Sequence, residues 1–180
     1  IVMVAVDGSR LSHQAFDVAM SLKCKNEKVI IYHVYDSSKT MKQQRELLSS
    51  YFGHEHLEIE FISKCLAVKC TNYSIVCEDR FLSSTNSTSK MIMNYADNNN
   101  VTTLVVGSFG RKGPSVWGVG SKVKQTIHSA RSGLTVVTAK INSRTYEKVQ
   151  TFVVGIDGSP KSFESFIWSM NRIQHKNDRM

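Results

Sequence analysis

Short apolar runs alternate with amphipathic segments over the first 138 residues of the chain. The runs are rich in valine and isoleucine and span residues 1–6, 28–34, 72–78, 102–107 and 134–138. Runs of this length and composition are typical of buried strands. Between the first two runs, apolar residues recur at helical spacing, at Leu11, Ala15, Val18, Ala19 and Leu22. The pattern therefore predicts strands that alternate with helices.

Three further segments are predicted to be helical. Residues 40–66 are interpreted as a long helix that Gly53 interrupts, and helical spacing returns around Ile92 and again from Val119 to Ala130. The strands are nearly continuous apolar runs, as expected when both faces of a sheet are buried. We therefore predict an α/β domain with a parallel sheet, helices on both faces and right-handed crossovers. Ligands bind such sheets at the carboxyl ends of the strands.

The C-terminal part of the chain repeats the beginning. Residues 152–170 match residues 2–20 at a constant offset of 150, with seven identities that include an intact Asp-Gly-Ser. This predicts a first domain at 1–140, a linker at 141–150 and a partial second copy at 151–180, with its first strand and helix only. Two such elements cannot bury their apolar faces alone. They could cover the first domain, exchange between chains, or be partly disordered.

Half of the ten glycines lie between Gly107 and Gly120, together with Arg111 and Lys112. This stretch follows the fourth predicted strand and opens a helix. Glycines let a phosphate approach the unpaired N–H groups of a helix N-terminus, and cations add to the attraction. A flexible surface loop is the alternative for glycine-rich sequence by itself. The stretch contains neither the P-loop motif nor the dinucleotide-binding motif G-x-G-x-x-G.

The composition and charge of the chain limit the kinds of ligand that it could bind and where it could be located. The net charge is +8, but the lysines are scattered and no aromatic residues interleave with them, so nucleic acid is not the expected ligand. The charge suits a small polyanion such as a nucleotide. No apolar stretch reaches the roughly 20 residues that cross a bilayer. No basic region precedes the first apolar run, which favours a cytoplasmic location. The cysteines form no C-x-x-C pair, so no metal site is predicted.

Three separated motifs carry a family resemblance. The spacing Gly107-x2-Gly110-x9-Gly120-Ser121 resembles the ATP-binding signature of the universal stress protein family. The start, VAVDGSRLS, is similar to the family's first strand and turn, and IYHVYD is similar to the end of its second strand. The resemblance covers residues 1–138. It implies a Rossmann-like sheet of five parallel strands in the order 3-2-1-4-5, with an adenine nucleotide across the strand ends.

The resemblance also implies which residues would contact the nucleotide. Asp7 would face the ribose or adenosine end, and the adenine pocket would be lined by Ala5 and by the backbone of Val34. Val106 and Gly107 would pass under the ribose. The phosphates would be surrounded by Gly110, Gly120, Ser121 and Lys122, and the positive charge of Arg111 makes it a further candidate for binding them. Alternatively, Asp7 is a turn residue, and for Ser9 we prefer the interpretation as a helix N-cap.

Three functions are compatible with the sequence. The preferred one is an ATP- or AMP-binding stress-response protein, a sensor or switch with no catalytic residue. The second is a slow ATPase that uses Mg²⁺, although the nearest carboxylates, Asp7 and Asp36, are not placed as a dedicated base. The third is a dimeric scaffold that binds no nucleotide. The resemblance to the family also implies a homodimer that forms through the fifth strand.

Overall fold

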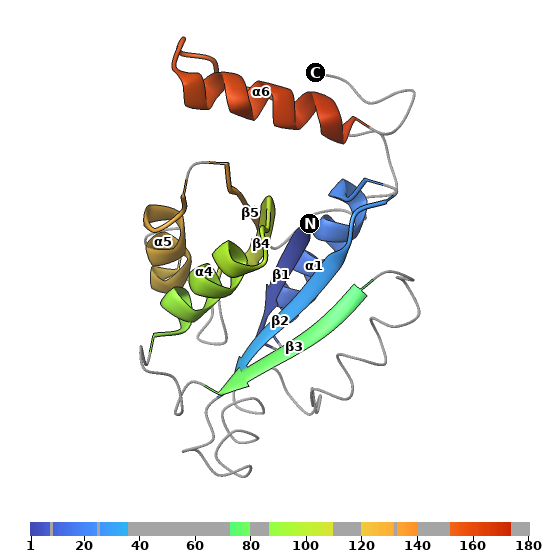
Figure 1. Cartoon of the computed structure of the whole chain (residues 1–180), viewed down its shortest axis with the longest axis vertical. Coiled ribbons are helices and arrows are strands. Elements are labelled where there is room, and N and C mark those ends of the chain that lie inside the picture. Colours follow the sequence, from blue (N-terminus) through green and yellow to red (C-terminus); the bar gives the residue numbers. More distant parts are fainter. Residues whose placement is uncertain are drawn as a thin grey trace.

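The computed structural model describes residues 1–7, 9–24, 26–35, 73–79, 87–109, 120–131, 133–139 and 152–173. A single parallel sheet organises them (Figure 1). Its strands are β1 (Val2–Val6), β2 (Val29–Tyr35), β3 (Tyr73–Asp79), β4 (Thr103–Gly107) and β5 (Thr135–Ala139). Their order is β3-β2-β1-β4-β5, so the predicted fold class and strand order are confirmed.

Helices cover both faces of the sheet because successive strand residues point to opposite sides. In β1, Val2, Val4 and Val6 belong to a core with α1 (Arg10–Leu22). Met3 belongs to a second core, formed with α4 (Thr88–Asn98) and α5 (Ser121–His128). All four of these β1 side chains are at most 6% exposed. Burial on both sides explains why the strands are apolar along their whole length.

Some predicted segments lie outside the described residues: the helix at 40–66, most of the glycine-rich loop and the linker at 141–150. The five strands agree with the predicted runs to within a residue or two. None of the described helices is long and apolar enough to cross a membrane.

Helix α6 (Pro160–Arg172) begins in the same way as α1, 150 residues earlier. In both copies the aspartate accepts a hydrogen bond from the second residue after it, at 3.0 Å from Ser9 N to Asp7 Oδ1 and 2.9 Å from Ser159 N to Asp157 Oδ1. Each of these serines then caps its helix by accepting an N–H. The sequence repeat is therefore also a repeat of local structure.

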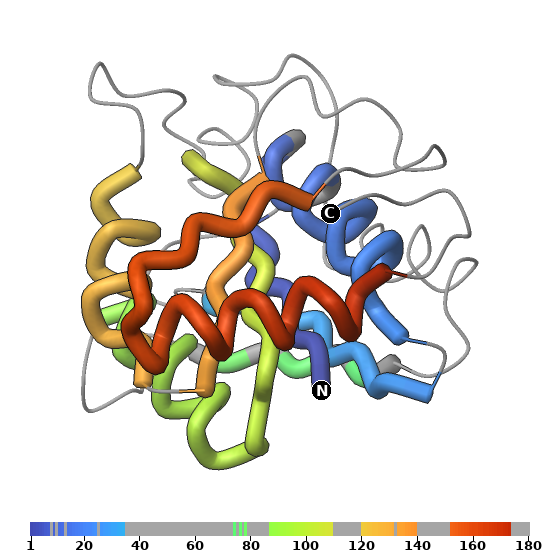
Figure 2. The backbone as a smooth tube through the Cα atoms, turned by 90° about the horizontal axis from the view of Figure 1, so that it is seen from above, coloured from blue at the N-terminus to red at the C-terminus, as the bar shows by residue number. Residues whose placement is uncertain are grey.

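The strand predicted at the start of the second copy is wrong, because residues 152–157 form no strand. A strand needs backbone partners, and β1 has β2 on one side and β4 on the other. Residues 152–157 have no such neighbours among the described strands. Together with α6 they form a unit at residues 152–173, which we call the C-terminal cap. It lies over the end of the sheet where the N-terminus is found (Figures 1 and 2).

Candidate functional site

The order of the strands creates a crevice at the carboxyl ends of β1 and β4. The chain leaves β1 through α1 toward β2, whereas it leaves β4 through α5 toward β5. Neighbouring connections that diverge in this way leave a gap between them, and open α/β sheets bind ligands there. Most of the predicted site residues that the structure describes stand at this edge.

Three apolar site residues share one face of the sheet. Ala5 is the register partner of Val106 in the adjacent strand. Val106 belongs to the core beneath α4 and α5, and Ala5 and Val34 pack against that same core. Val106 is 5% exposed, while Ala5 and Val34 are half-buried. The three predicted residues are thus brought together as an apolar surface near the strand ends.

Gly107 ends β4 in close contact with α1. A Cβ on Gly107 would lie 3.0 Å from Leu11 Cβ and 3.1 Å from the backbone carbon of Leu11. Only glycine fits here without moving α1 or β4. The packing of the fold therefore already requires this glycine, apart from any ligand.

Gly120 is the N-cap of α5, and no side chain caps this helix end. Its own N–H donates to the carbonyl of Ser108 at 2.9 Å, which holds the helix start beside the end of β4. Ser121 and Lys122 are exposed in the first turn. An uncapped N-terminus presents N–H groups and a partial positive charge, and Lys122 adds a cation. This arrangement suits an anionic group such as a phosphate.

Asp7 and Ser9 stand at the end of β1. The carboxylate of Asp7 accepts a hydrogen bond from the N–H of Ser9. Ser9 Oγ accepts a hydrogen bond from Ser12 N at 3.2 Å and so caps α1. The N-cap interpretation of Ser9 is confirmed. Asp7 therefore stabilises the turn after β1, as its alternative interpretation predicted. This turn lies at the edge of the crevice. Gly110, Arg111 and Asp36 lie outside the described residues.

Two residues near the crevice were not selected from the sequence. The imidazole of His33, which is 7% exposed, donates through Nδ1 to the carbonyl of Val6 at 2.8 Å and so fixes the end of β1. Ser108, which is 1% exposed, donates its N–H to the Ala139 carbonyl and accepts from Gly120 N. Among the described residues, its hydroxyl has no hydrogen-bond partner. The sequence signal that could have identified Ser108 is its position, because it is a polar residue directly after a buried strand.

A buried phenol lies under the apolar surface of the site. Tyr32 is 1% exposed and donates to Glu78 Oε2 at 2.6 Å, with the ring of Tyr95 4.7 Å away. Burial, followed by the hydrogen bond to Glu78, raises the pKa of Tyr32 far above its usual value. Tyr32 is therefore a neutral hydrogen-bond donor that ties β2 to β3. Within the described ranges, no three His, Cys, Asp or Glu side chains gather as metal ligands do.

These features define a doubly wound α/β protein with an uncapped helix N-terminus at its switch point. The family model of the universal stress protein family matches residues 1–138. The chain belongs to this family, as the three sequence motifs predicted. The predicted partial second copy at 151–180 lies beyond the match.

Solved structures agree on the fold. Protein MJ0577 superposes with a TM-score of 0.56 at 18% identity, over 79% of this chain and 96% of its own. UspA, the universal stress protein from Lactobacillus plantarum, gives 0.54 at 18% identity over 77% and 95%. A universal stress protein in complex with cAMP gives 0.51 at 20% identity over 77% and 94%. No curated protein matches the chain.

Proposed function

We propose that this protein binds an adenine nucleotide, ATP, ADP or AMP, at the β1–β4 crevice and acts as a stress-response sensor or switch. The observation that carries the proposal is the N-terminus of α5. Gly120 leaves it without a side-chain cap and holds it against Ser108, next to the end of β4. A phosphate placed there would accept hydrogen bonds from the N–H groups of the first turn.

Each part of the nucleotide has matching chemistry in this crevice. The apolar surface of Ala5 and Val34 suits an adenine ring, and Val106 and Gly107 provide a flat backbone for the ribose. The carboxylate of Asp7 is the acceptor for a ribose hydroxyl. Ser121 and Lys122 would contact phosphate together with Gly120. Gly110 and Arg111, outside the described residues, complete the proposed set.

The proposal is for binding rather than turnover. Hydrolysis needs a positioned water and a base. Asp7, the carboxylate that the structure places at this edge, already accepts the N–H of Ser9. ATP hydrolysis would therefore be slow, even if Mg²⁺ were bound together with the nucleotide. Self-association through β5 and a cytoplasmic location also stay predictions.

The first experiment identifies what the protein carries. The purified chain is denatured and the released small molecules are identified by mass spectrometry, and stripped protein is titrated with ATP, ADP, AMP and cAMP by calorimetry. We expect about one adenine nucleotide per chain, with the phosphates contributing to affinity. If nothing is released and no titration gives heat, the glycines serve only the turn, and the scaffold function replaces this proposal.

A further inference from the structure

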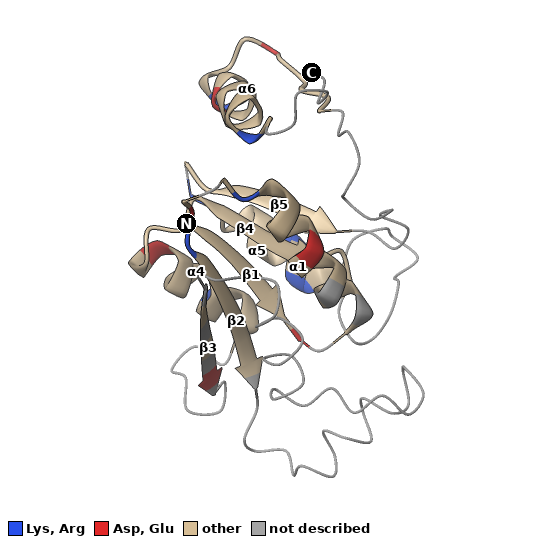
Figure 3. Cartoon of the chain, turned by 90° about the vertical axis from the view of Figure 1, so that its right-hand side faces the viewer, with Lys and Arg blue, Asp and Glu red and all other residues tan. Residues whose placement is uncertain are grey.

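A carboxylate of β3 lies beside the apolar surface of the crevice. The carboxyl end of β3 is acidic (Figure 3), and there Glu78 is the register partner of Val34 in β2. Val34 is one of the residues proposed to line the adenine pocket. Since hydrogen-bonded strands run about 4.7–4.9 Å apart, Glu78 stands one strand spacing from this surface.

The side chain of Glu78 is on the same face of the sheet as this surface. Tyr32 belongs to the core beneath α4 and α5, and Val34 and Val76 pack against that core. Residues two apart in a strand point to the same side, so Glu78 shares the face of Val76. The hydrogen bond from the Tyr32 hydroxyl to Glu78 Oε2 at 2.6 Å confirms this orientation.

Tyr32 holds the carboxylate of Glu78 in place. The Tyr32 side chain is 1% exposed, and its ring packs against that of Tyr95 with 4.7 Å between the centroids. Its hydroxyl donates to Oε2 of Glu78, and none of the residues that the structure describes donates to the other oxygen, Oε1. Glu78 is half-buried, so Oε1 is a fixed acceptor at the edge of the crevice. A carboxylate oxygen accepts hydrogen bonds, so the matching group on a ligand is a donor.

The order of the strands matches the order of the parts of a nucleotide. Val6 is the register partner of His33, so Asp7 comes next at the level of Val34. Beyond Asp7 lies the end of β4, with the N-terminus of α5 beside it. A nucleotide with its phosphates at α5 and its ribose at Asp7 would therefore place its base over Val34. The far edge of this base would meet Glu78 in the next strand.

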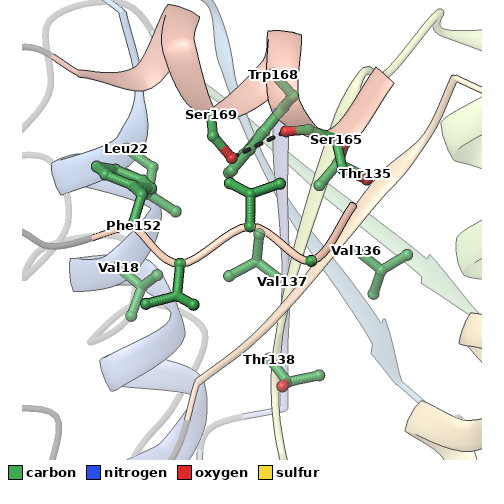
Figure 4. Close-up of a pocket in the computed structure, with 13 residues that line it drawn as sticks. Val18, Leu22, Thr135, Val136, Val137, Thr138, Phe152, Ser165, Trp168 and Ser169 are labelled. Atoms are coloured by element: carbon green, nitrogen blue, oxygen red, sulfur yellow. Dashed lines mark hydrogen bonds between the residues drawn. The ribbon is translucent and has the colours of Figure 1, made fainter. Parts of the chain in front are cut away.

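A cavity on the opposite face of the sheet lacks such an acceptor. It measures about 580 Å³ and lies between α1, β5 and the C-terminal cap (Figure 4). Apolar side chains and hydroxyl groups line it, and no charged side chain of the described residues contributes to the lining. Val18 belongs to this lining and to the α1 core, whereas Tyr32 belongs to the other core. A nucleotide would therefore find no charged partner there among the described residues.

We propose, on the basis of the nucleotide site proposed above, that Glu78 selects adenine among the purines by accepting a hydrogen bond from the exocyclic amino group, and that Tyr32 positions it. Guanine and hypoxanthine carry a carbonyl oxygen at the same ring position. This oxygen would bring one acceptor against another. A site built to hydrogen-bond an N–H of its ligand rejects an analogue that lacks the group, because the polar group of the site is left unpaired.

The experiment measures the affinity of full-length variants for ATP and for inosine triphosphate (ITP) by calorimetry. ITP carries a carbonyl oxygen where ATP has its amino group. In Glu78→Gln the amide can donate as well as accept, so it tolerates both bases. Tyr32→Phe keeps the carboxylate and removes the hydroxyl that positions it. Circular dichroism confirms that each variant is folded.

Asp97→Asn is the matched control. It removes the same charge as Glu78→Gln, but Asp97 is exposed near the end of α4, where it pairs with Arg131. The chain enters β4 shortly after this point, so Asp97 lies near the edge of the sheet opposite the crevice. A change that Asp97→Asn reproduces would reflect net charge rather than recognition of the base, and would refute the proposal.

We expect wild type and Asp97→Asn to bind ATP at least about tenfold more tightly than ITP, because a hydrogen bond to a charged group is at stake. The ratio should fall to within about threefold in Glu78→Gln, since its amide can pair with either base. Tyr32→Phe should lower the ratio to a value between these two. An unchanged ratio in Tyr32→Phe would refute the positioning role, whether or not Glu78→Gln folds.

The outcomes separate this inference from the nucleotide site itself. If wild type binds ATP and ITP equally, the site stands and the role of Glu78 is refuted. A preference for ATP that survives in folded Glu78→Gln assigns the selection to another group, such as the backbone of Val34, and also overturns the inference. If wild type binds neither nucleotide, the proposed function fails, and Glu78 serves only as the partner of Tyr32.

Discussion

At the scale of single residues, the two glycines of the crevice have different reasons to be there. Gly107 is required by α1, because a Cβ would come within 3.2 Å of three atoms of Leu11. Gly120 has φ −60° and ψ 148°, a conformation that any residue adopts, and its Cβ would come within 3.3 Å of the Ser108 carbonyl oxygen. Substitutions should therefore separate stability at Gly107 from ligand binding at Gly120.

Gly120→Val tests the phosphate site. The added side chain would stand where a phosphate must approach the first turn of α5, so we expect nucleotide binding to be lost while the fold is kept. Calorimetry and circular dichroism measure the two. Gly155→Val is the control, because a Cβ at Gly155 meets no atom within 4 Å. Unchanged affinity in a folded Gly120→Val protein would refute the site.

Gly107→Ala tests the packing requirement. Leu11 and β4 would have to move apart by a few tenths of an ångström, and overpacking of a core contact costs about 1–3 kcal/mol. We expect a loss of this size in the free energy of unfolding, measured with urea. A stability equal to wild type would mean that α1 yields without cost.

At the scale of elements, α1 and α6 share a capped beginning but not their surroundings. Ser9 is 1% exposed and caps a helix in the core of the domain. Ser159 is half-buried and caps a helix that touches the domain mainly through Trp168, Ser169 and Arg172. The same hydrogen bond should therefore matter to different cooperative units of the protein.

Ser9→Ala and Ser159→Ala form a matched pair. Loss of an N-cap costs about 1 kcal/mol of helix stability. We expect Ser9→Ala to lower the global free energy of unfolding by that amount, and Ser159→Ala to loosen the cap and leave the domain nearly unchanged. Urea unfolding followed by circular dichroism reports the domain, and the fluorescence of Trp168 in a Trp117→Phe background reports the cap. Equal global losses would mean that cap and domain unfold together.

At the scale of the whole molecule, an ion pair between Arg172 and Glu27 links the C-terminal cap to the first domain. Burial by itself would raise the pKa of Glu27, but the hydrogen bond and charge of Arg172, with the N–H of Cys24, lower it below its ordinary value of 4.5. Because the folded-state pKa is lowered, the stabilisation is complete above pH 4.5. It is lost as the pH falls through the lowered pKa.

Acid should therefore release the cap before it unfolds the domain. In a Trp117→Phe background, Trp168 is the remaining tryptophan and reports docking. We expect its fluorescence to change as the pH falls below 4.5, while the circular dichroism stays constant. Glu27→Gln keeps the hydrogen-bonding shape without the charge, so its fluorescence should not depend on pH in this range. The same pH response in Glu27→Gln would assign the transition to another group.

The sequence by itself determined the sheet, and it pointed to several residues of the candidate site. Apolar runs fixed the five strands because parallel strands are buried on both faces, and Gly107, Gly120 and Ser9 were identified because loop and cap positions select particular residues. The tertiary structure decided what depends on distant neighbours. His33 donates to Val6 in the neighbouring strand, and Ser108 bridges β5 and the start of α5. Residues 152–157 lack, among the described strands, the partners that make β1 a strand. Local patterns specify local geometry, whereas pairing and docking depend on surfaces that exist only after the chain has folded.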